Sequence, residues 1–325
     1  MTDLLAILRD PNTQWILLGC MLLGLSSGLI GTFAYLRKQS LMGDTLAHAA
    51  LPGICIAFML TGTKSILGFL IGAGIAGVVA TFGISWITRH SKLKSDAAMG
   101  IVLSGFFGIG IVLLTQIQHS GNGNQSGLDK FLFGQAASLI GSDVTTMLIV
   151  CSLLILGCAA LFKEFKLVSF DPGFAKGLGY PVVMLDHLIM FFMVVSVVIG
   201  IQAVGVVLVA ALLITPAVSA RYWTDRLGWM VVLAGLFGAL SGAVGTLISA
   251  SVDNMPTGPL SVLSATLVFV FSLLFGPRKG LLAKKLIHRK AKAEVQREMA
   301  ESRQQQQQQQ QLQQSHASVK EGATL

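Results

Sequence analysis

Residues 182–220 read VVMLDHLIMFFMVVSVVIGIQAVGVVLVAALLITPAVSA, an apolar block of 39 residues. A helix that crosses the hydrocarbon core of a bilayer needs about 20 such residues. The block is therefore too long for a single crossing. It predicts two membrane helices that fold back on each other near Gly200–Gly205, where glycines and Gln202 interrupt the apolar run. This stretch indicates an integral membrane protein.

The composition of the whole chain favours the same class. Of its residues 53% are hydrophobic and only 12% are charged, whereas soluble domains have about 25% charged residues. The 36 glycines suit membrane helices that approach each other closely. The net charge of +8 comes mostly from the end of the chain, since ten Lys/Arg and four Asp/Glu follow from residue 278 onward. The basic balance therefore predicts no nucleic-acid partner.

Further apolar runs predict the remaining membrane helices. They cover residues 15–36, 41–60, 65–88, 97–115, 144–162, 228–252 and 259–276. Together with the block at 182–220 they predict an all-α polytopic membrane protein with nine transmembrane helices, or eight if one is re-entrant. Residues 1–14 carry charges and precede a run long enough to span, so we expect no cleaved signal peptide.

Charges in the connecting segments predict the orientation. One alternating set of connections holds ten Lys/Arg and the other set, with the N-terminus, holds three. The positive-inside rule places the first set in the cytoplasm, with the N-terminus outside and the C-terminus inside. The predicted parts are an extracytoplasmic N-terminus (1–14), a transmembrane domain (15–279), a basic cytoplasmic segment (280–303) and a disordered glutamine-rich tail (304–325).

Two ionisable residues lie within an apolar span, in the stretch Ser40-Leu-Met-Gly-Asp44-Thr-Leu-Ala-His48. At i and i+4 their side chains share one face of a helix. Ionisable groups inside a membrane mark functional sites, and a carboxylate beside an imidazole suits divalent transition metals. A hydrogen bond between helices and a proton relay are the alternatives. The position of Asp44 close to Arg37 places the pair in the inner part of a channel, or requires a backbone break at Gly43.

Weaker candidates follow in the long apolar block. Gln202 lies at the predicted fold-back and is expected to line an entrance or to satisfy freed backbone groups. Thr215-Pro216 predicts a kink with gating potential, although packing alone would explain it too. The four cysteines show no metal-binding spacing and are expected to be small buried hydrophobic residues.

A short helix is predicted between two spans, at residues 170–180. Asp171-Pro172 opens it, because the acid caps the first turn and proline is tolerated there. Ala175 and Gly179 follow at i+4 and i+8 and would give one small-residue face. Such a face at the membrane surface is suited to docking in a groove of another protein, although the segment alone is also explained as a connector.

Several motifs occur together in one order. They are SLMGDxxxHxxxPG from Ser40, LFGQ at 132–135, SFDxxxAxxxG from Ser169, QAVG at 202–205, LLITPA at 212–217 and PTGP at 256–259. In order and spacing they resemble the permeases of bacterial ABC importers for manganese, zinc and iron. The resemblance covers residues 15–282, and the glutamine-rich tail departs from it.

The resemblance implies a channel of two identical or closely related permease subunits in the bacterial plasma (inner) membrane. It implies Asp44 and His48 as metal ligands and Asp171, Ala175 and Gly179 as contacts to a cytoplasmic ATPase. It also implies an extracytoplasmic metal-binding protein that delivers Mn²⁺, Zn²⁺ or Fe²⁺ as cargo, with no tightly bound cofactor. The chain contains no G-x-x-x-x-G-K-[ST] motif, so we expect it not to be the ATP-hydrolysing enzyme. The alternative is a secondary cation transporter that uses Asp44 and His48 as a relay.

Overall fold

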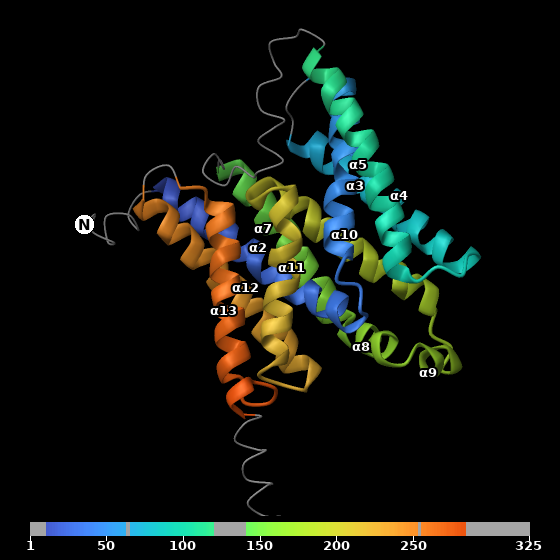
Figure 1. Cartoon of the computed structure of the whole chain (residues 1–325), viewed down its shortest axis with the longest axis vertical. Helices are drawn as coiled ribbons and strands as arrows, with labels where there is room; N and C mark the ends of the chain where they lie inside the picture. The colour runs from blue at the N-terminus through green and yellow to red at the C-terminus, as the bar shows by residue number, and fades with distance from the viewer. Residues whose placement is uncertain (1–10, 63–65, 120–140, 253–254, 284–325) are drawn as a thin grey trace, which may run out of the picture.

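The computed structural model describes residues 11–62, 66–119, 141–252 and 255–283. Within these ranges all regular secondary structure is helical. The helices are α2 (Pro11–Leu36), α3 (Met42–Thr61), α4 (Ile66–His90), α5 (Ser95–His119), α7 (Gly141–Ala160), α8 (Phe162–Phe170), α9 (Pro172–Gly177), α10 (Val182–Val204), α11 (Val206–Arg221), α12 (Leu227–Ser251) and α13 (Thr257–Phe275). Figure 1 shows the long helices packed in one bundle, with α8 and α9 at one end of it.

The predicted all-α polytopic membrane fold is confirmed. In the described part of the chain, eight helices are long and apolar enough to cross a membrane, namely α2, α3, α4, α5, α7, α10, α12 and α13. Helix α11 is also apolar but has only 16 residues, fewer than the roughly 20 that a perpendicular crossing needs. The choice between the predicted eight and nine crossings therefore depends on α11.

The interruption in the 39-residue apolar block lies at Gly205. This residue ends α10 and begins α11, with φ 90° and ψ 163°. That backbone conformation is essentially restricted to glycine, so the break needs glycine at this position. The predicted break near residues 200–205 is confirmed.

Helices α2 and α12 approach each other through residues without large side chains. The carbonyl oxygen of Gly238 lies where a Cβ on Gly24 would be, and the carbonyl oxygen of Ala234 lies where a Cβ on Gly28 would be. Gly242 meets the carbonyl of Cys20 in the same way. Moving four residues towards the C-terminus of α2 brings each contact four residues closer to the N-terminus of α12. The two helices are therefore antiparallel and have a fixed register. Small residues permit such contact in a bilayer, where packing rather than the hydrophobic effect drives helix association.

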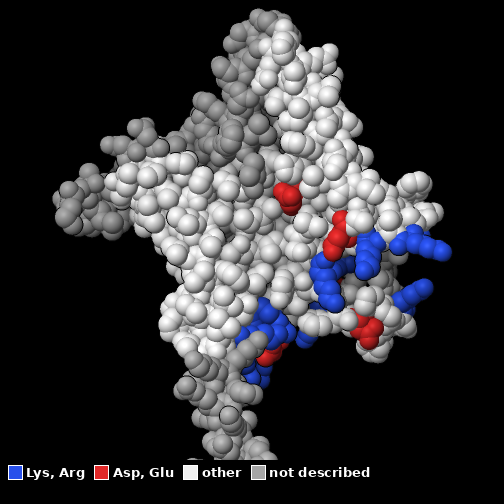
Figure 2. Space-filling view, in the orientation of Figure 1, with Lys and Arg blue, Asp and Glu red and all other residues white. Residues whose placement is uncertain are grey.

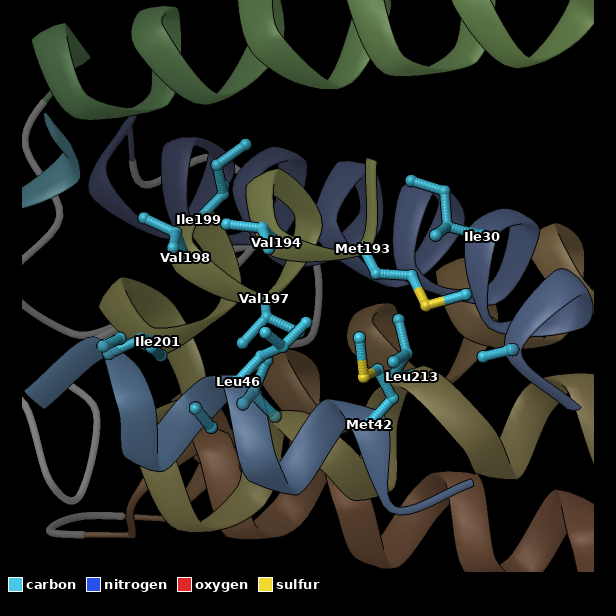
Figure 3. Close-up of a cluster of buried hydrophobic side chains, with 14 of the residues drawn as sticks. Ile30, Met42, Leu46, Met193, Val194, Val197, Val198, Ile199, Ile201 and Leu213 are labelled. Atoms are coloured by element: carbon cyan, nitrogen blue, oxygen red, sulfur yellow. The ribbon is translucent and has the colours of Figure 1, made fainter. Parts of the chain in front are cut away.

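A buried apolar cluster joins α3 to the centre of the bundle. Figure 3 shows Met42 and Leu46 of α3 directed towards Val197 of α10 and Leu213 of α11. Met42, Val197 and Leu213 have no exposed surface, and Leu46 is also buried. The first turns of α3 are therefore held against α10 and α11.

Basic side chains gather at one end of the molecule. Figure 2 shows the Lys and Arg of this face gathered towards the end that carries α8 and α9, with acidic residues among them and one in the middle of the face. The connections at this end include those between α2 and α3 and between α11 and α12. The orientation of this end towards the cytoplasm remains a prediction from the positive-inside rule.

The turn between α2 and α3 contains a left-handed lysine. Lys38 has φ 58° and is the one non-glycine residue with positive φ in the described ranges. The backbone N–H of Gln39 donates to Ala34 (2.9 Å) and that of Lys38 to Tyr35 (3.1 Å). This pattern is the Schellman motif, which usually has glycine at the left-handed position.

We expect Lys38→Gly to raise the stability of the folded protein. The left-handed conformation costs a non-glycine residue about 1–2 kcal/mol, and the greater freedom of glycine in the unfolded chain offsets about half of that gain. We expect the free energy of unfolding to increase by about 0.5–1 kcal/mol. The melting temperature of the detergent-solubilised protein should then rise by a few degrees. The matched control is Lys92→Gly in the α4–α5 connection, where φ is not positive. An equal gain in both variants would contradict the assignment of strain to Lys38.

Two stretches differ from the sequence prediction, and others lie outside the described residues. Helix α2 begins at Pro11, four residues before the apolar run, because proline is well accommodated in the first turn. Residues 163–170, which lie between the predicted span 144–162 and the predicted short helix, belong to a further helix, α8, whose Phe165 packs against Phe33 with ring centroids 5.6 Å apart. The LFGQ motif at 132–135, most of segment 280–303 and the tail at 304–325 lie outside the described residues.

Candidate functional site

Asp44 and His48 lie on the first two turns of α3, as predicted. His48 Nε2 is 3.4 Å from Asp44 Oδ1, and the two side chains are 19% and 39% exposed, respectively. Asp44 belongs to the first turn of the helix, where the partial positive charge of the helix N-terminus stabilises a carboxylate. A carboxylate oxygen and an imidazole nitrogen therefore lie close together on a partly open face of an otherwise apolar helix.

The imidazole of His48 is fixed from two sides. Its ring meets the ring of Phe107 on α5 edge to face, with centroids 4.8 Å apart. Nε2 faces Asp44, while Nδ1 is buried and has no hydrogen-bond partner within the described structure. Sequence reasoning did not identify Phe107, because its contact depends on how α5 packs against α3. The aromatic contact and the carboxylate together hold the imidazole with Nε2 beside Asp44.

The helix that carries the pair is continuous at Gly43. Helix α3 begins at Met42 and includes Gly43, so the predicted alternative of a backbone break is wrong. A Cβ at Gly43 would lie 2.9 Å from Leu213 Cδ2 and 3.3 Å from Ala210 Cα. The glycine is thus required for close packing on α11. The pair accordingly lies near the α2–α3 turn, at the end of the bundle where basic residues gather.

The Asp44–His48 pair is too small by itself for a closed metal site. In the described ranges, no group of three or more His, Cys, Asp or Glu is placed to hold a metal. Cys20, Cys55, Cys151 and Cys158 are free and buried. As predicted, they fill space in the bundle. Two candidate ligands are fewer than the four that divalent transition metals generally take in closed sites, so a metal held here would need further ligands.

The predicted short helix is present as α9. The backbone N–H of Phe174 donates to Asp171 Oδ1 at 2.9 Å, and Pro172 occupies the first turn. Gly179 lies beyond the helix end with φ 84°. The cap and the stop signal were therefore correctly predicted from sequence.

The predicted small-residue docking face is wrong. Ala175 has no exposed surface, and Gly179 lies outside the helix, so the two do not form one exposed stripe. Exposed apolar residues of this segment include Phe174 (58%) and Leu178 (57%), besides Phe170 (61%) and Tyr180 (40%). Phe174 and Leu178 lie four residues apart, and Leu178 directly follows the last residue of α9. A bulky residue at Ala175 would disturb the packing of α9 itself.

The gating candidates have different local settings. Pro216 is buried inside α11, and the carbonyl of Thr215 accepts a hydrogen bond of 2.7 Å from Ser219 Oγ. Proline removes one helix hydrogen bond at this position. Gln202 lies in the last turn of α10, and its side chain is outside the described part. A gating role for these three residues stays a prediction.

A partly buried ion pair joins two elements that sequence reasoning treated separately. Arg37, directly after α2, pairs through Nη2 with Asp186 Oδ1 in the second turn of α10. Sequence reasoning did not identify a charged partner for Asp186 at another helix. Arg37 and Asp186 have opposite charges and lie at spans on the same predicted side of the membrane, which was the one sequence feature that indicated a pair. Whether they meet depends on the three-dimensional packing.

Eight membrane-length helices and a partly open carboxylate–imidazole pair define a multi-pass membrane transport protein. A family model described as the ABC 3 transport family matches residues 9–276. The chain belongs to this family, whose members are permease subunits of ABC transporters in the bacterial inner membrane.

Individual relatives are similar over most of the chain. The chain is 56% identical to the manganese transport system membrane protein MntC of Bacillus subtilis, over 85% of this chain and 64% of that protein. It therefore spans less than two thirds of the length of that relative. It is 44% identical to the zinc transport system membrane protein TroC of Treponema pallidum, over 87% of this chain and 95% of that protein.

A solved structure has the same fold. PsaBC from Streptococcus pneumoniae in complex with Fab is 32% identical, with a TM-score of 0.76. The match covers 87% of this chain and 99% of that chain. The likeness extends over the whole helical bundle described above.

Proposed function

We propose that this chain is the permease subunit of an ABC importer that carries a divalent transition-metal ion into the cytoplasm. The cargo is Mn²⁺ first, with Zn²⁺ or Fe²⁺ next. The observation that carries the proposal is the Asp44–His48 pair, a carboxylate and an imidazole 3.4 Å apart on a membrane helix. Ligands of this type suit such ions. The relatives named for manganese and zinc transport support the choice of cargo.

The metal path is formed between two copies of this chain, or between this chain and a close paralogue. The 39% exposure of Asp44 leaves the pair open to a second subunit. Two-fold symmetry would bring a second Asp–His pair to the same axis and double the number of ligands. Oxygen and nitrogen ligands that are partly hydrated bind an ion weakly enough to release it, as conduction requires.

The partners follow from the two ends of the bundle. With the N-terminus outside, α9 faces the cytoplasm and docks into a separate ATPase subunit, while an extracytoplasmic binding protein delivers the ion on the other side. Phe174 and Leu178 are the expected anchors, and segment 170–180 is the coupling helix of the 15–279 permease domain. ATP hydrolysis belongs to the partner, because the sequence lacks a P-loop.

The test is reconstitution of the chain with its ATPase in proteoliposomes that enclose a metal-sensitive dye. We expect Mn²⁺ uptake that requires ATP and stops when the ATPase carries an inactivated nucleotide site. The matched control is an imposed pH gradient without ATP, which should produce no uptake. Uptake driven by the pH gradient alone would contradict the proposal and favour the secondary-transporter alternative.

We expect Phe174→Ala combined with Leu178→Ala to weaken the complex with the ATPase. Exposed aromatic and aliphatic anchors at the centre of an interface contribute about 2 kcal/mol or more each, which corresponds to about 30-fold in affinity. Co-purification with the ATPase should fall while the permease itself stays folded. The control is Phe271→Ala, since Phe271 is similarly exposed but lies on α13, away from α9. Equal co-purification of both variants would argue against docking through α9.

A further inference from the structure

The Arg37–Asp186 ion pair is the most enclosed charge pair of the described residues. The side chains of Arg37 and Asp186 are 14% and 24% exposed, whereas the Arg221–Asp225 pair is 26% and 51% exposed. Burial lowers the pKa of Arg37 to about 10, so the guanidinium is still charged at neutral pH. An enclosed pair of this kind contributes little net stability but is costly to break on one side.

On the α10 side the pair is connected to α9 through the backbone. The N–H of Tyr180 donates to the carbonyl of Ala175 (3.1 Å), and that of Leu185 donates to Pro181 (3.0 Å). Ala175 is fully buried, so α9 is fixed to the structure beneath it. Asp186 is the residue that follows Leu185. A displacement of α9 would therefore be transmitted to the first turns of α10.

On the other side the pair is connected to the metal ligands. Arg37 belongs to the hydrogen-bonded turn with the left-handed Lys38, and Met42 at the start of α3 donates to Gln39 (3.1 Å). Asp44 follows two residues later. Figure 3 shows the same first turns of α3 directed towards α10 and α11 through Leu46 and Met42. The turn from Arg37 to Asp44 is thus a short, bonded segment.

We propose that the Arg37–Asp186 pair is a positioning link that couples movement of α9 to the position of Asp44 and His48. This inference rests on the proposed docking of α9 on an ATPase. When the ATPase moves α9, the first turns of α10 move with it, and the ion pair pulls the α2–α3 turn that carries the ligand helix. Without the pair, only apolar packing would connect α3 to α10. Apolar surfaces slide past each other more easily than a charged contact breaks, so α3 would follow the movement of α9 and α10 less closely.

The test is the number of ions transported per ATP hydrolysed, measured in proteoliposomes that contain the permease and its ATPase. Arg37→Gln combined with Asp186→Asn removes both charges and leaves no unpaired ion. We expect this variant to bind Mn²⁺ and the ATPase normally but to transport at least about fivefold fewer ions per ATP, the lower end of typical couplings between sites. Arg37→Asp combined with Asp186→Arg should recover most of the ratio.

The matched control is Asp225→Asn, which removes the exposed ion pair with Arg221 at 3.3 Å and should keep the wild-type ratio. Because the neutral double variant could fail to fold, hydrogen exchange in the wild-type complex gives a second readout. Residues 37–45 should change their exchange rate when a non-hydrolysable nucleotide closes the ATPase, and no change there would overturn the inference.

The two proposals fail in different ways. If the folded neutral variant takes up Mn²⁺ at the wild-type rate and with the wild-type number of ions per ATP, only the positioning link is overturned. Absence of ATP-dependent uptake by the wild type would overturn the proposed function, and the link with it.

Discussion

Asp44→Ala and His48→Ala should each abolish ATP-dependent Mn²⁺ uptake while the protein still inserts and folds. Each change removes one of the two proposed metal ligands, whose side chains lie on a single helical face, 3.4 Å apart. Loss of an outer-shell partner of a metal ligand costs about 10–100-fold in metal affinity, so loss of a ligand should reduce uptake at least about 100-fold. Neither side chain is part of the buried apolar core, so little stability is lost. The measurement is radiolabelled Mn²⁺ uptake in cells that lack their own importer.

The controls use the same residue types at positions away from the pair. Asp96→Ala lies in the first turn of α5, and His90→Ala lies in the last turn of α4. Both side chains are exposed. Both controls should retain uptake when normalised to membrane protein level. Near wild-type uptake by the Asp44 and His48 variants would remove the pair from the transport path.

Gly24→Leu should prevent the protein from folding to its native bundle. The carbonyl oxygen of Gly238 occupies the space that any Cβ at Gly24 would need, and backbone cannot give way as a flexible side chain can. Overpacking of a core costs about 1–3 kcal/mol when the neighbouring groups can move. A clash with the backbone of α12 should cost more than this range, because the backbone cannot move aside. Fluorescence-detected size exclusion of a tagged chain should show aggregated or absent protein.

Gly74→Ala is the matched control for the helix crossing. Gly74 also lies inside a membrane helix, α4, but a Cβ there would meet nothing within 4 Å. This variant should elute and melt like the wild type. A monodisperse Gly24→Leu protein with an unchanged melting temperature would contradict the α2–α12 packing described here.

The apolar runs contained enough information to locate the helices. A run of about 20 apolar residues in a bilayer forms a membrane-spanning helix. The spans and the break at Gly205 could therefore be predicted. The abundance of glycine predicted close helix contact. That Gly24 meets Gly238 could not be predicted, because the register of two helices far apart in sequence depends on the packing of every neighbour.

The site was predictable in part for the same reason. Asp44 and His48 share a helical face through local periodicity alone, and the cap at Asp171 is equally local. Burial of Ala175 and the pairing of Arg37 with Asp186 are tertiary features. A short helix does not reveal from sequence which of its faces rests on the bundle, and this is why Phe174 and Leu178 were missed as the exposed residues.

The most direct test of a metal path shared between two permease chains is the stoichiometry of Mn²⁺ binding to the purified permease–ATPase complex, measured by calorimetry. We predict one Mn²⁺ for every two permease chains, and loss of that binding when Asp44 is replaced by alanine in both. Binding of one ion per chain, or unchanged binding in the Asp44→Ala complex, would contradict the account.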